Sequence, residues 1–482
     1  MGALHDPEIE FPRLAKVADL IIKLSILLCV VFAIFCLKSF GWRPETYLPN
    51  PLSAMLYYAL GTVAAFFLIS LTLRMSYRIS LAIILLSTVC SAYTAELFLI
   101  WSGAEFYDQT KKAARIAAAR GLNFDTREKY QVVTDLQRQG VLAVPNVNPA
   151  LFLSRAGDGK LRSSITINST ETLPLSGIAN ELTVYCNENG DFVMYESDEH
   201  GFNNPRGIWK NPRLDVAIVG DSFTQGSCVP SDKNIAGIIR KRYPATLNLG
   251  MVNNGPLAEL ATVKEYLPTL KPKIVFWLYY EGNDLEDLIR EKQTPLLTAY
   301  LQNNSTQDLL KLQPEIDEAL NAYIQAHLRA PQRSAGRNIT DFIGQLKSIM
   351  KLEHSRTIVG LGSLMPDEVP DATLNLRLFQ QTLIEATALV STWNGRLYFV
   401  YLPEWLRYAH PKIASKHRDA VLTMVKSLAI PTIDMHLVFQ VQSDPLALFP
   451  FRLALHYNED GYRLAAETLL RFISIDPSAE SG

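Results

Sequence analysis

Cysteine and histidine are scarce in this chain, and neither sign of charge dominates. The 482 residues include five cysteines and eight histidines, and no spacing among them suggests a metal site. Lysine and arginine number 46 against 48 aspartates and glutamates, for a formal net charge of −2. This balance excludes a globally basic surface, so no nucleic-acid partner is expected. The sequence also lacks internal repeats and low-complexity tracts, and we expect no cofactor.

Long apolar runs, by contrast, crowd the N-terminal part of the chain. They are Val17–Leu37, Ala54–Leu73 and Leu81–Trp101. Each approaches the ~20 residues that a helix needs to cross ~30 Å of hydrocarbon. We therefore predict a short tail (1–16) followed by three transmembrane helices (17–102). A cleaved signal peptide is the alternative for the first run, but no small-x-small cleavage site follows Leu37 and two more runs come after it.

The basic residues around these runs predict the orientation of the chain. One side of the membrane would hold four of them, two before the first run and two between the second and third (Arg13, Lys16, Arg74 and Arg78). The other side would hold two, Lys38 and Arg43. The positive-inside rule therefore places the N-terminus in the cytoplasm. Everything after Trp101 would lie on the periplasmic or extracellular side of an inner (plasma) membrane.

The remainder of the chain has the composition of a soluble protein. Residues 103–140 are rich in charge and predict a juxtamembrane helix or stalk, and residues 141–212 predict a β-rich lead-in. From 213 to 475 apolar strands alternate with amphipathic helices, which predicts an α/β domain with a parallel sheet and helices on both faces. Residues 285–370 exceed one crossover and suggest a helical insertion. The predicted strands are Val216–Val219, Thr246–Leu249, Ile274–Tyr279, Leu397–Tyr401 and Thr432–Ile433.

The ends of the first three strands carry residues suited to acyl transfer. The first strand ends at Gly220-Asp221-Ser222, the second at Asn248-Leu249-Gly250 and the third at Gly282-Asn283-Asp284. His456 follows much later, just before a predicted helix. Acyl transfer needs a nucleophile, a base and donors aimed at the developing oxyanion. Serine can act as the nucleophile and histidine as the base. The donors would be a glycine N–H and an asparagine amide.

These blocks, in this order, resemble those of the SGNH (GDSL-type) esterase and acyltransferase superfamily over roughly residues 190–475. The resemblance implies a flavodoxin-like three-layer α/β/α domain with a five-stranded parallel sheet. It also implies that Ser222 is the nucleophile and His456 the base. The oxyanion hole would consist of the Ser222 N–H, the Gly250 N–H and the Asn283 side chain.

One position departs from the family pattern. The superfamily usually places an acid three residues before the histidine, where this chain has Leu453. Either His456 works without an acid, or another acid orients it, and Asp434 and Asp444 are the candidates. Some polysaccharide-acetylating members carry their Asp-x-His before the serine, which makes His200 in Asp198-Glu199-His200 a rival base.

Cys186 and Cys228 are the cysteines outside the apolar runs. In an oxidising compartment they could pair, and the bridge would tie the lead-in to the nucleophile turn because Cys228 lies six residues after Ser222. The alternative is two separate buried thiols.

Together these features predict a membrane-anchored serine esterase or O-acyltransferase that forms an acyl-enzyme on Ser222. The expected substrates are acyl esters, those of envelope glycans in particular, and a membrane acyltransferase is a candidate partner. The alternative is a non-catalytic subunit of an envelope polysaccharide-modifying assembly, which the missing acid at Leu453 and the large insertion favour.

Overall fold

The computed structural model describes residues 68–101, 109–302, 305–328, 372–411 and 417–475, together with scattered residues within 13–27, 63–66 and 349–355. The chain divides into two units. The first comprises 1–104 and 337–366, and the second comprises 105–336 and 367–482.

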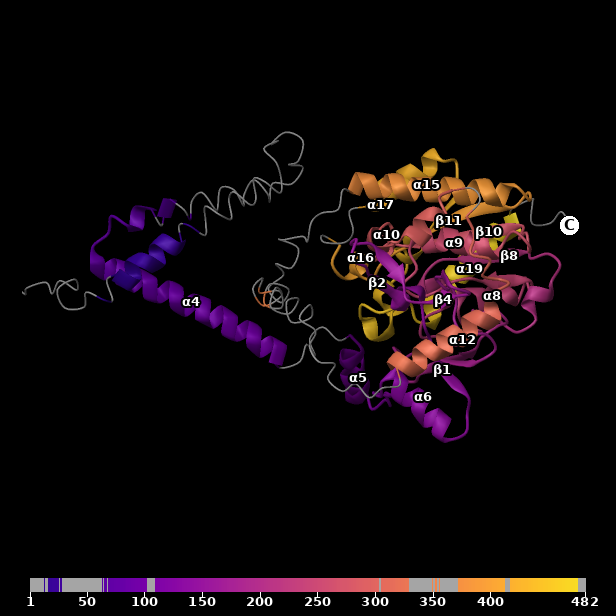
Figure 1. The fold of residues 1–482 in the computed structure, drawn as a ribbon, viewed down its shortest axis with the longest axis horizontal. Helices are drawn as coiled ribbons and strands as arrows, with labels where there is room; N and C mark the ends of the chain where they lie inside the picture. The colour runs from indigo at the N-terminus through magenta and orange to yellow at the C-terminus, as the bar shows by residue number, and fades with distance from the viewer. Residues whose placement is uncertain are drawn as a thin grey trace, which may run out of the picture. The chain divides into compact units, whose positions relative to one another are not determined.

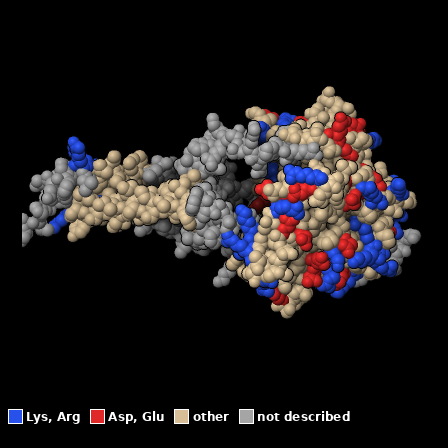
Figure 2. Space-filling view, turned by 90° about the horizontal axis from the view of Figure 1, so that it is seen from below, with Lys and Arg blue, Asp and Glu red and all other residues tan. Residues whose placement is uncertain are grey.

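One helix of the first unit, α4 (Met75–Trp101), matches the third apolar run (Figure 1). Its stretch Met75–Phe98 is the one described helix that is long and apolar enough to cross a membrane. Apolar side chains such as Ile84 and Phe98 are exposed along it, and its surface carries almost no charge in Figure 2. Most of the first two runs lies outside the described residues, so the structure supports one of the three predicted transmembrane helices.

The second unit contains a five-stranded parallel sheet in the order β12-β11-β10-β8-β9. With the strands numbered along the chain, this is the flavodoxin-like order 2-1-3-4-5. The predicted parallel sheet is therefore confirmed, with strand bounds within two residues of those expected from the sequence. The strands are β8 (Val216–Val219), β9 (Thr246–Asn248), β10 (Ile274–Tyr280), β11 (Arg396–Leu402) and β12 (Thr432–Asp434).

Helices cover both faces of this sheet because every second side chain points to the same face. Val275 and Trp277 of β10 belong to a core shared with α9 and α15. Phe276 and Leu278 belong to a second core shared with α8 and α19. Figure 1 shows these helices around the strands. The helices of the domain are α7 (Ser222–Gln225), α8 (Ile235–Arg240), α9 (Pro256–Tyr266), α10 (Asp284–Glu291), α11 (Pro295–Ala299), α12 (Gln313–Tyr323), α15 (Ala372–Ser391), α16 (Leu406–Ala409), α17 (Arg418–Ser427), α18 (Met435–Phe439) and α19 (Glu459–Ile475).

The segment before the domain is built from short elements. Two helices, α5 (Gln109–Ala119) and α6 (Lys129–Arg138), occupy the predicted juxtamembrane stretch. Residues 141–212 then form a small sheet in the order β1-β6-β7 and two hairpins. Their strands are β1 (Ala143–Pro145), β2 (Leu153–Arg155), β3 (Leu161–Ser163), β4 (Thr166–Ile167), β5 (Thr170–Glu171), β6 (Leu182–Cys186) and β7 (Val193–Glu196).

The predicted insertion at 285–370 begins with α10, α11 and α12, followed by a π-helical turn at Ile324–Leu328. Most of residues 329–371 lies outside the described part of the chain. The described part of this stretch therefore contains helices separated by turns and irregular segments.

Candidate active site

Ser222 lies at the carboxyl edge of the sheet, on the first turn after β8. Asp221 caps helix α7 by accepting the Phe223 N–H at 2.9 Å, which holds Ser222 as the first helical residue. The turn requires glycine at 220, because an added Cβ would lie 2.2 Å from Thr224 Oγ1. The strand and its cap therefore present the hydroxyl where ligands bind in open α/β sheets.

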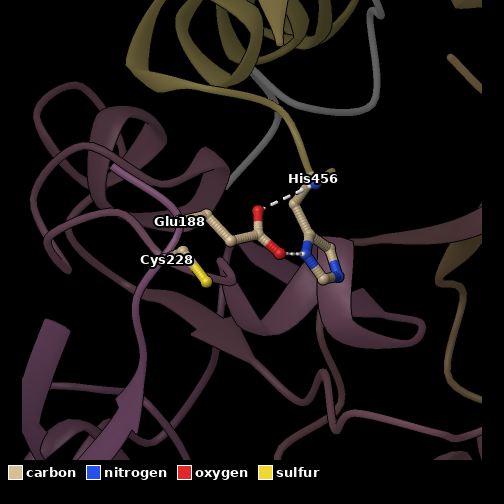
Figure 3. A group of neighbouring side chains, drawn as sticks. All are labelled: Glu188, Cys228 and His456. Carbon is tan, nitrogen blue, oxygen red and sulfur yellow. Dashed lines mark hydrogen bonds and ion pairs between the residues drawn. The ribbon is translucent and has the colours of Figure 1, made fainter. Parts of the chain in front are cut away.

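Three side chains line up at this edge. His456 Nε2 lies 2.9 Å from Ser222 Oγ, and His456 Nδ1 lies 2.7 Å from Glu188 Oε1. The other carboxylate oxygen, Glu188 Oε2, accepts the His456 backbone N–H at 2.9 Å. Figure 3 shows the carboxylate facing the imidazole ring. With Nδ1–H donated to Glu188, Nε2 is left as an acceptor for the serine proton, as a general base requires.

Sequence reasoning missed Glu188 as a site residue. It lies in the turn between β6 and β7, and it comes to His456 from a segment 268 residues away in the sequence. Its carboxylate occupies the place that an acid at position 453 would serve, so Leu453 does not leave His456 without an acid. The predicted Cys186–Cys228 bridge was the one signal that could have drawn attention to this turn.

The structure does not bring Asp434 or Asp444 to His456. Asp434 caps α18 by accepting the His436 N–H at 3.0 Å and forms an ion pair with Arg418. Asp444 forms an ion pair with Arg452. Both carboxylates are thus held by nearby arginines, and Glu188 makes the contact that they were expected to make.

Cys186 and Cys228 form a disulfide across 42 residues, which is one of the two possibilities that the sequence left open, with their Cα atoms 5.2 Å apart. The bridge joins the end of β6 to the turn after α7. The sulfur of Cys228, the carboxylate of Glu188 and the imidazole of His456 lie within 4.8 Å of one another, a spacing that could hold a metal ion. Zinc binds thiolate, however, and this sulfur is already bonded to Cys186. The carboxylate and imidazole are hydrogen-bonded to each other.

Electrostatics favour the charged form of His456. Burial opposes protonation of the imidazole, but the negative charge and hydrogen bond of Glu188, together with Asp221, outweigh it and raise the pKa of His456 above 6.5. Burial also raises the pKa of Asp221, although bonds from the Phe223 N–H and the Asn283 amide act in the other direction. The site therefore stabilises an imidazolium, which forms when the base takes the serine proton.

The three predicted oxyanion donors differ in the hydrogen bonds that they make. No hydrogen bond from the Ser222 N–H is found among the described residues. The Asn283 amide, directly before α10, bonds to Asp221. The Gly250 N–H instead donates to Asn248 Oδ1 at 2.9 Å, so the loop itself uses it. Glycine is still needed at 250, because an added Cβ would lie 2.2 Å from the Gln225 N atom of helix α7.

His200, the rival base, lies apart from Ser222. Its ring packs against the Trp209 ring at 4.4 Å, and burial lowers its pKa. Asp198, two residues earlier, accepts the His200 and Phe202 N–H groups and so shapes the turn. No hydrogen bond joins His200 to Ser222 in the described residues. The Asp198-Glu199-His200 motif therefore has a structural place in the lead-in.

The second unit combines a flavodoxin-like parallel sheet with a serine after β8 and a histidine before α19, the arrangement that the resemblance to the SGNH (GDSL-type) superfamily implied.

Several solved structures are similar to part of this chain. A member of the lipolytic protein G-D-S-L family from Veillonella parvula is 15% identical, with 55% of this chain and 100% of that chain covered and a TM-score of 0.29. A lipase/acylhydrolase from Enterococcus faecalis is 12% identical, with 54% and 95% covered and a TM-score of 0.28. A two-domain esterase active on acetylated mannans is 12% identical, with 55% and 50% covered and a TM-score of 0.28. No protein-family model and no curated protein matches the chain.

Proposed function

We propose that this protein is a serine ester hydrolase or O-acyltransferase in which Ser222, His456 and Glu188 act as nucleophile, base and orienting acid. The observation that carries the proposal is the hydrogen-bonded series from Ser222 Oγ through His456 to Glu188, at 2.9 Å and 2.7 Å. Such a series matches the roles of a Ser-His-acid triad, in which the acid fixes the tautomer and orientation of the imidazole.

In the proposed reaction, Ser222 Oγ attacks the carbonyl carbon of an ester while its proton passes to His456 Nε2. The carbonyl oxygen becomes an oxyanion near the Ser222 N–H and the Asn283 amide. When the tetrahedral intermediate collapses, the C–O bond of the ester breaks, and His456 returns the proton to the leaving alcohol. An acyl ester on Ser222 remains. Each oxyanion donor contributes on the order of 3–4 kcal/mol of transition-state stabilisation in enzymes of this chemistry.

The second half of the reaction repeats these steps with a new nucleophile. Water, deprotonated by His456, would release a free acid, whereas a sugar hydroxyl would accept the acyl group. In both halves the Glu188 carboxylate accepts the hydrogen bond from His456 Nδ1 and offsets the charge of the imidazolium.

We further propose that α4 anchors this domain to a membrane and that its substrates are acyl esters of envelope glycans. The exposed apolar surface of α4 supports the anchor. The Cys186–Cys228 disulfide supports an oxidising, extracytoplasmic location. The glycan substrate rests on the resemblance to the superfamily and on this location. If the protein transfers acyl groups, it needs a supplier of them, and a membrane acyltransferase is the candidate partner.

The alternative of a non-catalytic subunit loses one of its two grounds. It rested on the missing acid at Leu453 and on the large insertion at 285–370, and the Glu188 carboxylate lies beside His456 where an acid was missing.

Ester hydrolysis and active-site labelling of the full chain in detergent test the proposal. The native protein should hydrolyse a short-chain nitrophenyl ester and react with a fluorophosphonate probe, and both signals should disappear in Ser222→Ala. His456→Ala should lose at least about 10³-fold in kcat, whereas His200→Ala should keep most of the activity. A folded native protein that neither hydrolyses the ester nor takes the label would reject the proposal. Adding an acetylated glycan and an acceptor sugar then separates transfer from hydrolysis.

A further inference from the structure

Residues 120–125, which directly follow α5, contact the turn that carries Glu188. We call them the bridge segment. The Asp125 N–H donates to Gly190 O at 2.6 Å, and Asn187 Nδ2 donates to Asp125 O at 2.9 Å. An added Cβ on Gly190 would lie 3.0 Å from Asn123 O. The bridge segment and the Glu188 turn are therefore hydrogen-bonded in both directions and packed at backbone distance.

The same segment contacts the residues that lead into His456. The Phe124 and Phe451 ring centroids are 6.1 Å apart, and the Arg120 guanidinium lies 6.0 Å from the Phe451 ring. Phe451 is the fifth residue before His456 in the sequence. The bridge segment thus contacts the stretch that leads to His456 as well as the turn that carries Glu188.

The stretch at Phe451 needs such support. Phe451 and Arg452 have φ values of 51° and 62°, in the left-handed region that bulky residues rarely adopt. Two consecutive residues in this region persist only where neighbouring groups hold them. Trp405 Nε1 donates to Arg452 O at 3.0 Å on one side, and Phe124 with Arg120 packs on the Phe451 ring.

We propose that the bridge segment is a positioning element of the active site. By packing on the Glu188 turn and on Phe451 together, it keeps the carboxylate and the imidazole at hydrogen-bonding distance. This inference rests on the proposed function. Along the chain, only residues 102–108 separate α5 from the candidate membrane helix α4. The geometry of the site would therefore depend on the stretch of chain that follows this helix.

The first test compares Phe124→Ala with Leu122→Ala in the full chain. Leu122 lies in the same segment with 53% of its surface exposed, so its truncation removes an apolar side chain that is largely in contact with solvent. We expect kcat for a short-chain ester to fall about 10²-fold in Phe124→Ala, with KM nearly unchanged. Leu122→Ala should match the native protein, and Phe124→Tyr, which keeps the ring, should restore activity.

The pH profile separates positioning from general destabilisation. Glu188 and Asp221 are the charged groups that face His456. Burial lowers the pKa of His456, and Glu188 raises it. If Phe124→Ala loosens Glu188, the pKa of His456 should therefore fall, and the acidic limb of kcat/KM should move to lower pH. A variant that is merely less stable would contain less active protein, but its acidic limb of kcat/KM would lie at the same pH as in the native protein.

Asn187→Ala provides a second, independent variant on the acid side. It removes the hydrogen bond to Asp125 O and also the two bonds between the Asn187 side chain and Gly190 within the Glu188 turn. It leaves the Phe124–Phe451 contact, and it should shift the acidic limb of kcat/KM in the same direction. The inference is overturned if both variants fold and keep the native kcat and acidic limb, or if activity falls only with thermal stability. Absence of Ser222-dependent activity in the native chain would instead reject the proposed function, and the inference with it. The two failures can be told apart, because the native chain is assayed before any variant of the bridge segment is made.

Discussion

At the scale of residues, the site combines a serine fixed by its strand with a histidine controlled by a carboxylate. Asp221 orders the nucleophile turn, and Glu188 binds both the side chain and the backbone of His456. Because Glu188 holds Nδ1–H, Nε2 faces Ser222 as an acceptor. The raised pKa of His456 has a direct consequence, since only the neutral imidazole can take the serine proton.

Activity should therefore fall as the pH drops through a pKa above 6.5, where His456 becomes protonated. Glu188→Gln removes the negative charge that raises the pKa of His456, while the burial that lowers this pKa remains. The acidic limb of kcat/KM should therefore move to lower pH. The loss of the orienting carboxylate should also reduce kcat by about 10²–10⁴-fold. Glu196→Gln, on the exposed part of β7, is the matched control. An unchanged limb in Glu188→Gln would exclude Glu188 as the acid of this site.

At the scale of elements, the lead-in sheet is joined to the nucleophile helix by buried contacts. Tyr185 on β6 donates to Gln225 Oε1 at 2.8 Å, and Gln225 Nε2 donates to Asn146 Oδ1 at 2.9 Å. The disulfide from Cys186 to Cys228 adds a covalent link at the same place. The small sheet thus holds the acid turn against α7, and its attachment should matter for both stability and catalysis.

Replacing Cys186 and Cys228 with serine should lower the unfolding free energy by about 4 kcal/mol, as expected for closing a loop of 42 residues. Thermal unfolding of the native protein should also shift to lower temperature in reductant, whereas the double serine variant should not respond. Cys90→Ser, which removes the free cysteine of α4, serves as the control. If reductant demonstrably frees both thiols but the melting temperature stays constant, the bridge does not stabilise the domain.

At the scale of the whole molecule, the two units differ in surface character. The first carries the apolar surface of α4, and on the visible face of the second, acidic and basic side chains are interspersed (Figure 2). This pattern fits a membrane segment linked to a water-soluble domain. A disulfide beside the catalytic residues fits a domain outside the cytoplasm.

The proposed orientation predicts how reporter fusions behave. Alkaline phosphatase fused after Gly482 should be active in bacterial cells, and green fluorescent protein at the same point should be dark. Fusions after Arg74, which directly precedes α4 on the predicted cytoplasmic side, should show the opposite pattern. The reverse result at both points would place the domain in the cytoplasm. Fractionation with the membrane after alkaline carbonate washing checks the anchor separately.

Much of the fold and part of the site could be predicted because they depend on local pattern. Short buried strands such as Val216–Val219 are apolar runs bounded by turns, so their bounds follow from the sequence alone. Ser222, Asn283 and His456 stand next to strand ends or helix starts, and the order of these elements along the chain brings them to one edge. Local sequence could not show that the Gly250 N–H would be used by Asn248, because that depends on a side-chain rotamer.

The sequence by itself thus determined the parallel sheet and the residues proposed as nucleophile and base, since each is encoded in a stretch of a few residues. Only the tertiary structure decided which acid meets His456. Glu188 arrives from the turn of a separate small sheet, 268 residues away along the chain. Its place is set by the disulfide and by packing against the bridge segment, and no spacing within the sequence records such contacts.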